Sequence, residues 1–247
     1  MMRVLVFQHI SVEHPGIFRD FLAADGGSWD AVELDAGEAI PSFDGPAFDK
    51  YDALWVMGGP MDVWQEREHP WLVTEKKAIR RWVGAGRPFL GVCLGHQLLG
   101  DALGGRVGPG AAPEVGILAV ELTEAGRADP LFKGLPATKR CLQWHGAAVL
   151  EPPPGAVVLA GSPICPIQAM RVGRCAYGLQ YHVEATADTV PEWGCVPEYE
   201  ASLEAVQGAG ALRRFRDETA RHLPALNAAA RTLYDNFAAI VRAGRRL

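Results

Sequence analysis

The first hundred residues alternate between short apolar runs and segments with apolar residues at helical spacing, and this alternation constrains the fold more than any other feature. Predicted strands cover residues 2–8, 31–34, 51–57 and 88–93, and predicted helices cover residues 15–25, 70–83 and 94–103. Repetition of β-α units is typical of a parallel sheet with helices on both faces. We therefore expect an α/β fold, a three-layer sandwich with a mostly parallel central sheet.

The second half of the chain has a different pattern. Short strand candidates cover residues 117–122, 139–143, 156–160, 167–171 and 175–181, and glycine and proline turns separate them. These strands are expected to extend the sheet, partly in antiparallel orientation. From about residue 198 the chain is rich in alanine and helical in pattern, with expected breaks at Gly208–Gly210 and Pro224. We expect a single domain over residues 1–247, with a core at about 2–190 and C-terminal helices at about 198–243 packed on it.

Composition excludes several functional classes. The chain has 247 residues, of which 49% are hydrophobic, and a net charge of −5, so a packed core is expected and a basic nucleic-acid-binding surface is not. No apolar run is long enough for a membrane span, and the N-terminal run is too short for a signal peptide, so a cytoplasmic location is expected. The cysteines form no C-x-x-C pair, and the glycines of segment 104–110 lack dinucleotide-binding spacing. Neither a metal site nor a cofactor is therefore expected.

The segment Gly91-Val92-Cys93-Leu94-Gly95 joins a predicted strand to a predicted helix. This is the pattern of a nucleophile elbow, a strained turn that presents its central residue at the carboxyl edge of the sheet. The flanking glycines are needed because Cβ atoms there would clash across the turn. A helix N-terminus also favours a thiolate. Cys93 is therefore the candidate nucleophile, and the alternative is a buried cysteine in a glycine-rich turn.

A cysteine nucleophile needs a base and an oxyanion hole. A second apolar strand ends in His182-Val183-Glu184, and residues i and i+2 of an extended chain point to the same side. Glu184 can then bind one ring nitrogen of His182 while the other faces Cys93, although His-x-Glu by itself is most often a surface pair. The backbone N–H groups of Leu94 and Gly59 are the candidate oxyanion donors.

Together these segments resemble the class I (triad) glutamine amidotransferases, in particular the stand-alone branch that is similar to the amidotransferase of GMP synthase. The resemblance spans about residues 2–190 and rests on matching segments at Gly58-Gly59-Pro60, Gly91 to Gln97, and His182 to Glu184. It implies a flavodoxin-like sandwich and a triad of Cys93, His182 and Glu184. This triad would hydrolyse the side-chain amide of glutamine through a γ-glutamyl thioester and release ammonia and glutamate.

The same resemblance implies which residues contact the substrate. They are Gly58, Gln97, His145 and Gly146. Two departures from the family pattern stand out: Val183 replaces a frequent proline, and Gly146-Ala147 replaces a frequent acidic or hydroxyl residue.

Three functions remain open at this stage. The chain could be a glutaminase that delivers ammonia to a separate synthetase subunit, because it contains neither a Walker A motif nor a Ser-Gly-Gly-x-Asp-Ser pyrophosphatase loop. It could instead hydrolyse γ-glutamyl peptides or conjugates without a partner. The third reading is a non-catalytic binding or regulatory module on the same fold. The sequence leaves the ammonia acceptor and the oligomeric state open.

Overall fold

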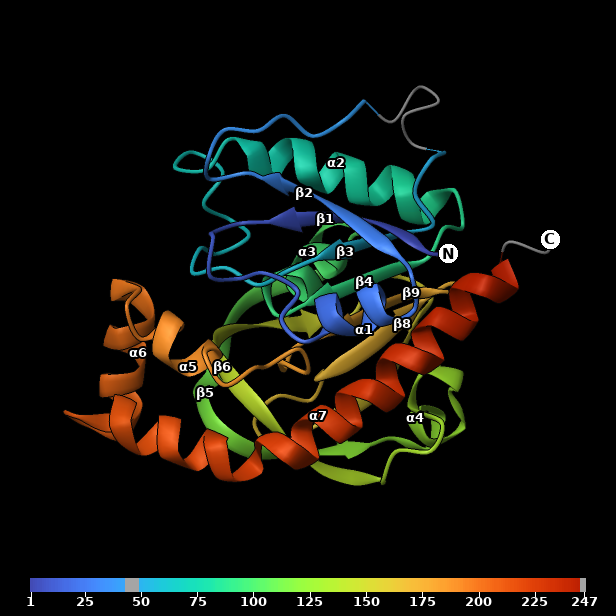
Figure 1. Ribbon diagram of the computed structural model, residues 1–247. Helices are drawn as coiled ribbons and strands as arrows, with labels where there is room; N and C mark the ends of the chain where they lie inside the picture. The colour runs from blue at the N-terminus through green and yellow to red at the C-terminus, as the bar shows by residue number, and fades with distance from the viewer. Residues whose placement is uncertain (43–48, 245–247) are drawn as a thin grey trace.

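The computed structural model describes residues 1–42 and 49–244. Within these residues the strands form a single sheet in the order β2-β1-β3-β4-β9-β8-β7-β5-β6 (Figure 1). The strands are β1 (Arg3–Gln8), β2 (Ser28–Glu33), β3 (Ala53–Val56), β4 (Phe89–Val92), β5 (Arg106–Leu122), β6 (Thr138–Glu151), β7 (Ala156–Gly161), β8 (Ala169–Val172) and β9 (Ala176–Leu179). The helices are α1 (Phe18–Ala24), α2 (Trp71–Gly84), α3 (Leu94–Ala102), α4 (Glu124–Ala128), the 3₁₀ turn η1 (Pro130–Phe132), α5 (Thr189–Trp193), α6 (Pro197–Gln207) and α7 (Ala211–Gly244).

The half of the sheet that carries the candidate site is parallel, as the sequence predicts for the strands of the first hundred residues. Strand β1 pairs in parallel with β2 and β3, β3 pairs with β4, and β4 pairs with β9. The register places Val92 opposite Leu179. The residues that follow these two positions, Cys93 and Gln180, therefore leave the same edge of the sheet side by side.

Helices cover both faces of this sheet, so the three-layer arrangement is confirmed. Alternate residues of β1 face opposite sides: Val4 and Val6 pack in a cluster with α1 and α7, whereas Leu5 and Phe7 pack with α2 and α3. This is the period of two that a strand imposes. Figure 1 shows α2 on one side of the sheet and α1 with α7 on the other.

The second half of the chain continues the sheet with antiparallel strands, also as predicted. Its strands β5 and β6 are much longer than the sequence pattern indicates, because they form one long antiparallel pair with a register shift between Pro109 and Glu114. Residues 106–116 are rich in glycine, alanine and proline. They carry little intrinsic strand preference, so pairing with β6 defines this part of β5.

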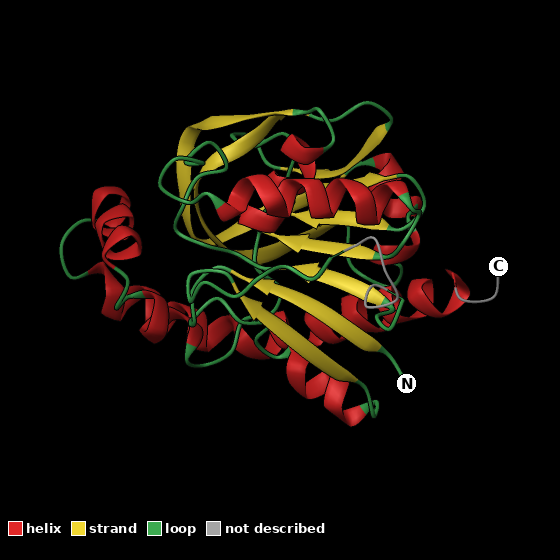
Figure 2. Ribbon diagram, turned by 90° about the horizontal axis from the view of Figure 1, so that it is seen from above, coloured by secondary structure: helices red, strands yellow, loops and turns green. Residues whose placement is uncertain are grey.

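Helix α6 lies at the end of the sheet where the candidate site is, and α7 runs along one face of the sheet (Figure 1). The predicted break at Gly208–Gly210 is confirmed, and it separates α6 from α7. The predicted break at Pro224 is wrong, because α7 continues through it. Leu226 and Phe215 are buried on either side of the proline, and this packing outweighs its local cost. Figures 1 and 2 both show α6 and the start of α7 extending beyond the sheet.

Across residues 1–42 and 49–244, no helix combines the length and the apolar character that crossing a membrane requires.

Candidate active site

Cys93 occupies the strained turn between β4 and α3. Its backbone has φ 51° and ψ −106°, and among the described residues it is the one non-glycine with a positive φ. Such conformations cost about 1–3 kcal/mol and cluster at functional sites. A Cβ on Gly91 would lie 2.3 Å from the Gly95 carbonyl oxygen, and a Cβ on Gly95 would lie 2.0 Å from the Val56 carbonyl oxygen. Both flanking glycines are therefore required by the close approach of backbone.

Hydrogen bonds fix the elbow to two neighbouring strands. The N–H of Cys93 donates to the carbonyl of Leu179 at 2.8 Å, and the N–H of Gly95 donates to Met57 at 3.1 Å. Leu94 is the first residue of α3, where a backbone N–H has no acceptor within the helix. Its N–H is therefore available next to Cys93.

His182 and Glu184 lie just beyond the end of β9, and the structure brings their side chains together. Nδ1 of His182 lies 2.6 Å from Oε1 of Glu184, and both side chains are at most 4% exposed. The other carboxylate oxygen accepts the N–H of Val183 at 2.9 Å. Burial opposes a charge on the ring, but Glu184 and Cys93 overcome it and raise the pKa of His182 well above its usual range. The rings of His182 and Trp193 pack edge to face, with 4.4 Å between centroids.

A second carboxylate, Glu13, lies beside this pair. It follows β1, is 1% exposed, and offers a ligand atom within 4.8 Å of those of His182 and Glu184. Tyr199 on α6 donates its hydroxyl to Oε1 at 2.5 Å, while Oε2 has no hydrogen-bond partner among the described residues. Burial and the charge of Glu184 raise the pKa of Glu13, against the opposing effects of His182, Tyr199 and His9.

A pocket of about 480 Å³, including its open mouth, lies in front of Cys93. Several residues predicted from the sequence line it, namely Gly59, Cys93, Gln97, His145 and Gly146. Its other walls come from Pro60, Met61, Asp62, Trp144, Ala147, Glu198, Tyr199 and Ser202. Gly58, predicted as a substrate contact, lies outside this lining: its carbonyl faces His9 at 2.7 Å and its α-carbon faces Glu13.

Gln97 connects the pocket to the nucleophile. Its side-chain amide donates to the carbonyl of Ala147 at 3.0 Å and to Oε1 of Gln180 at 3.3 Å. Gln180 in turn points its own amide at the sulfur of Cys93, at 3.8 Å. With its N–H groups engaged, Gln97 can offer its carbonyl oxygen to a ligand.

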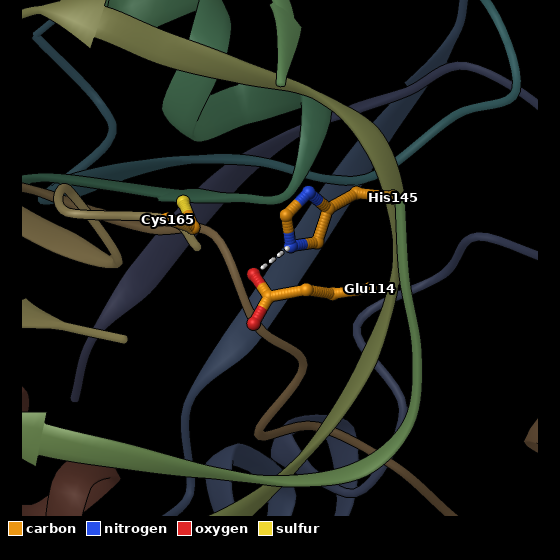
Figure 3. Close-up of side chains that lie close together, drawn as sticks. All are labelled: Glu114, His145 and Cys165. Carbon is orange, nitrogen blue, oxygen red and sulfur yellow. Dashed lines mark ion pairs between the residues drawn. The ribbon is translucent and has the colours of Figure 1, made fainter. Parts of the chain in front are cut away.

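The ring of His145 contacts the buried carboxylate of Glu114 (Figure 3). Its Nδ1 lies 3.0 Å from the Ala147 carbonyl and its Nε2 lies 3.2 Å from Oε2 of Glu114. Glu114 accepts hydrogen bonds from the Ser162 hydroxyl at 2.9 Å and from the Gln168 side-chain amide at 2.7 Å. This network fixes the pocket wall at residues 145–147.

Two buried groups have ligand atoms close enough together to hold a metal ion, Glu114 with His145 and Cys165, and Glu13 with His182 and Glu184. In the first group burial raises the pKa of Cys165 to about 12, assisted by Glu114, so without a bound ion the sulfur is a thiol. The carboxylate of Glu114 already accepts hydrogen bonds from Ser162 and Gln168. In the second group Glu184 is engaged by His182 and by a backbone N–H.

The sequence reasoning missed the parts of the site that come from distant elements. Glu13 follows a buried strand at the carboxyl edge of the sheet, and this was the one signal that could have identified it. Glu198, Tyr199 and Ser202 carry no local signal, because their place at the pocket depends on how α6 docks.

Comparisons with known proteins show the family of this chain. The family model for glutamine amidotransferase class-I matches residues 32–191. The glutamine amidotransferase-like protein YfeJ of Salmonella typhimurium is 34% identical over 236 residues, which cover 92% of this chain and 93% of that protein. A glutamine-hydrolyzing GMP synthase subunit of Pyrococcus abyssi is 44% identical over 98 residues, 39% of this chain and 50% of that protein.

Solved structures show the same likeness over nearly the whole chain. A glutamine amidotransferase from Thermotoga maritima superposes with a TM-score of 0.83 at 28% identity and covers 96% of this chain and 97% of its own. A glutamine amidotransferase from Methylobacillus flagellatus gives 0.83 at 27% identity, over 97% and 95% of the two chains. The expected fold is thereby confirmed, and the chain is an enzyme that belongs to the class I glutamine amidotransferase family.

Proposed function

We propose that this chain hydrolyses the side-chain amide of glutamine with Cys93 as nucleophile, His182 as acid and base, and Glu184 as the residue that orients His182. The observation that carries the proposal is the placement of Cys93 and the His182–Glu184 pair at the ends of paired strands. Cys93 has the strained backbone of an elbow, and Nδ1 of His182 lies 2.6 Å from the carboxylate of Glu184. That contact leaves Nε2 for proton exchange with the thiol.

The first half of the reaction forms the thioester. His182 takes the proton of Cys93, and the sulfur attacks the amide carbon of the substrate. The amide oxygen becomes an oxyanion that accepts hydrogen bonds from the N–H groups of Leu94 and Gly59. The C–N bond then breaks, and the His182 imidazolium gives its proton to the departing nitrogen, which leaves as ammonia. The raised pKa of His182 keeps that proton available at neutral pH.

The second half releases glutamate. His182, now neutral, takes a proton from water while the water oxygen attacks the thioester carbon. A second oxyanion forms and collapses, the C–S bond breaks, and the sulfur recovers its proton from His182. Because no residue is consumed, one triad serves both halves. The likeness to a glutamine-hydrolyzing GMP synthase subunit supports delivery of the ammonia to a separate synthetase.

The substitutions Cys93→Ala and Cys93→Ser test the proposal. Glutamate release from glutamine is expected to fall by roughly 10⁴-fold or more, since loss of a triad nucleophile removes the covalent route. Cys195→Ser alters an exposed cysteine and is the matched control. Hydroxylamine added to the wild-type protein should divert the thioester to γ-glutamyl hydroxamate. Unchanged glutaminase activity in Cys93→Ala would contradict the assignment.

One observation favours a second candidate, a partner-independent hydrolase of γ-glutamyl peptides or conjugates. The C-terminal helix α6 supplies Glu198, Tyr199 and Ser202 to the pocket wall, so this chain builds that wall itself. We infer that such a protein would turn over larger γ-glutamyl amides without a synthetase. The measurement compares kcat/KM for glutamine and for γ-glutamyl dipeptides with the purified chain alone. Turnover of glutamine without turnover of any dipeptide would exclude the second candidate.

A further inference from the structure

A buried ion pair, His9 with Glu75, lies behind the turn at Gly58-Gly59. His9 directly follows β1 and Glu75 belongs to α2, and their side chains are both 0% exposed. Nε2 of His9 lies 3.0 Å from Oε1 of Glu75, and the ring stacks on Trp71 at 5.4 Å between centroids. Removing two charged groups from water is costly. The burial of both His9 and Glu75 therefore needs a physical reason.

The second ring nitrogen of His9 engages the backbone of the turn. Nδ1 lies 2.7 Å from the carbonyl oxygen of Gly58. A carbonyl oxygen only accepts hydrogen bonds, so Nδ1 carries a proton. Nε2 faces Oε1 of Glu75, and an ionised Glu75 favours a proton on Nε2 as well, which makes the ring an imidazolium. Burial lowers the pKa of His9, but the charge and hydrogen bond of Glu75, assisted by Gly58 and Glu13, overcome this and raise it.

This contact fixes the direction of the Gly58–Gly59 peptide. The described chain contains no cis peptide bond, and in a trans peptide the C=O and the following N–H point in opposite directions. With the Gly58 oxygen turned toward His9, the Gly59 N–H points away from His9. Gly59 and Cys93 both line the pocket. Glu13 also packs against Gly58, since a Cβ on Gly58 would lie 2.5 Å from the carboxylate of Glu13.

The charge of His9 has a further effect on the same peptide. A hydrogen bond from a cation to a peptide oxygen is stronger than one from a neutral donor. It also polarises the amide, so that the N–H at the other end becomes a better donor. Glu75 keeps the proton on His9 and thereby maintains this polarisation.

We propose that His9 and Glu75 are positioning residues that orient and polarise the Gly58–Gly59 peptide, so that the Gly59 N–H stabilises the oxyanion. The inference rests on the proposed function, in which Cys93 attacks an amide and Gly59 is an oxyanion donor. It adds an electrostatic effect of Glu75 on α2, which acts through His9 on the oxyanion donor at the pocket. Neither His9 nor Glu75 contacts the substrate in this proposal.

Three substitutions separate orientation from charge. His9→Leu removes the donor and is expected to lower kcat by about 100-fold, near the loss seen when an oxyanion donor is removed. His9→Asn keeps an amide N–H close to the position of Nδ1 and is expected to lose only about tenfold. Glu75→Gln keeps a hydrogen-bonding partner for Nε2 without the carboxylate charge, with a loss of about tenfold expected. KM should change by less than about threefold in all three variants, because the substrate is not contacted.

Two reagents that use Cys93 differently provide the decisive readout. The γ-aldehyde analogue of glutamine forms a tetrahedral adduct whose oxygen occupies the oxyanion position, so its inhibition constant should rise in step with the fall in kcat. Iodoacetamide alkylates the sulfur at a tetrahedral carbon and forms no oxyanion, so its rate should stay within about twofold of wild type. His69→Asn is the matched control, because His69 packs on the same Trp71 ring at 5.4 Å.

The outcomes distinguish the two proposals. A parallel fall in alkylation and turnover would overturn the inference, since His9 would then act on the nucleophile or on folding. Unchanged aldehyde affinity in a variant with reduced kcat would overturn it as well. If His9→Leu fails to fold, His9→Asn and Glu75→Gln carry the same comparison. Full activity in Cys93→Ala would instead refute the proposed function itself.

Discussion

Glu13 and His182 are both buried beside the proposed triad, with ligand atoms within 4.8 Å of each other. The charge of His182 is among the influences that lower the pKa of Glu13, while burial and Glu184 raise it. Tyr199 donates to one oxygen of Glu13, and the other oxygen has no hydrogen-bond partner in the described part of the chain. The titratable groups around Glu13 are therefore His182 and Glu184 beyond β9, Tyr199 on α6 and His9 beyond β1. Ionised Glu13 should favour the imidazolium form of His182.

Glu13→Gln tests this coupling with little change in shape. At alkaline pH Glu13 is ionised in the wild type. Removal of this negative charge should lower the pKa of His182, so that His182 releases its proton at lower pH. The alkaline limb of the kcat profile should therefore move down in pH, with kcat there lower by roughly tenfold, equivalent to about 1.4 kcal/mol. The measurement is kcat for glutamine hydrolysis across pH. Glu200→Gln, an exposed change on α6, is the control; superimposable profiles for both variants would contradict the coupling.

At the residue scale, local pattern predicts only part of the site. Cys93 stands out because two glycines flank it between a strand and a helix, and His182 and Glu184 stand out because alternate residues of an extended segment share a side. Glu13 and Tyr199 are separated by 186 positions, so their hydrogen bond exists only once α6 has docked. No local pattern encodes such a contact.

At the scale of elements, the elbow depends on the contact between the end of β3 and the first turn of α3. A Cβ on Gly95 would lie 2.0 Å from the carbonyl oxygen of Val56. Gly95→Ala is therefore expected to force the two elements apart and to lower the free energy of unfolding by about 3 kcal/mol. Glutaminase activity should fall with it, because Cys93 would shift.

Gly84→Ala is the matched control for this prediction. Gly84 is the last residue of α2, and a Cβ there would meet nothing within 4 Å. The change should leave stability unchanged or raise it by up to about 1 kcal/mol, since alanine favours the helix. Both variants are measured by urea denaturation. Equal stabilities for Gly95→Ala and wild type would show that the β3–α3 contact can relax.

The elements themselves could be predicted to different extents. The β-α alternation of the first half follows from hydrophobic periodicity, and the parallel pairing of β1, β3 and β4 follows from it. The parallel pairing of β9 with β4 does not, because β9 comes from the second half of the chain. The length of β5 could not be read locally, since a glycine-rich stretch becomes a strand through pairing with β6. The continuation of α7 through Pro224 likewise reflects burial of its apolar face on the sheet and α5–α6.

At the scale of the whole molecule, α7 closes one face of the sheet over a buried cation. Lys139 on β6 points its ammonium at the rings of Phe132 and Tyr181, at 4.4 Å and 5.0 Å from the centroids. The nitrogen is buried and has no hydrogen-bond partner among the described residues. Desolvation lowers the pKa of Lys139 to about 8, although Cys141 opposes the shift. Folding thus buries a charged ammonium between the sheet and α7, and the two rings offset only part of the desolvation free energy.

Lys139→Met should therefore stabilise the protein at pH 7. In the wild type the folded state releases this proton near pH 8, whereas the unfolded chain keeps it until about pH 10.5, the ordinary value for lysine. Between these limits the unfolded state binds more protons, so the free energy of unfolding rises with pH. The variant should gain about 2 kcal/mol at pH 7 and lack this rise. Cys141, whose pKa burial raises to about 12, stays protonated over the same range.

The measurement is urea denaturation at pH 7 and pH 10 for wild type, Lys139→Met and Lys133→Met, the last altering an exposed lysine. The quantity that decides is the difference between variant and wild type at each pH, because other titrating groups cancel in it. That difference should shrink from pH 7 to pH 10 for Lys139→Met and stay near zero for Lys133→Met. A constant difference would mean that Lys139 remains fully charged in the folded protein. Lys139 would then keep its proton in the layer between the sheet and α7. The two aromatic rings would have to compensate in full for the desolvation of the ammonium.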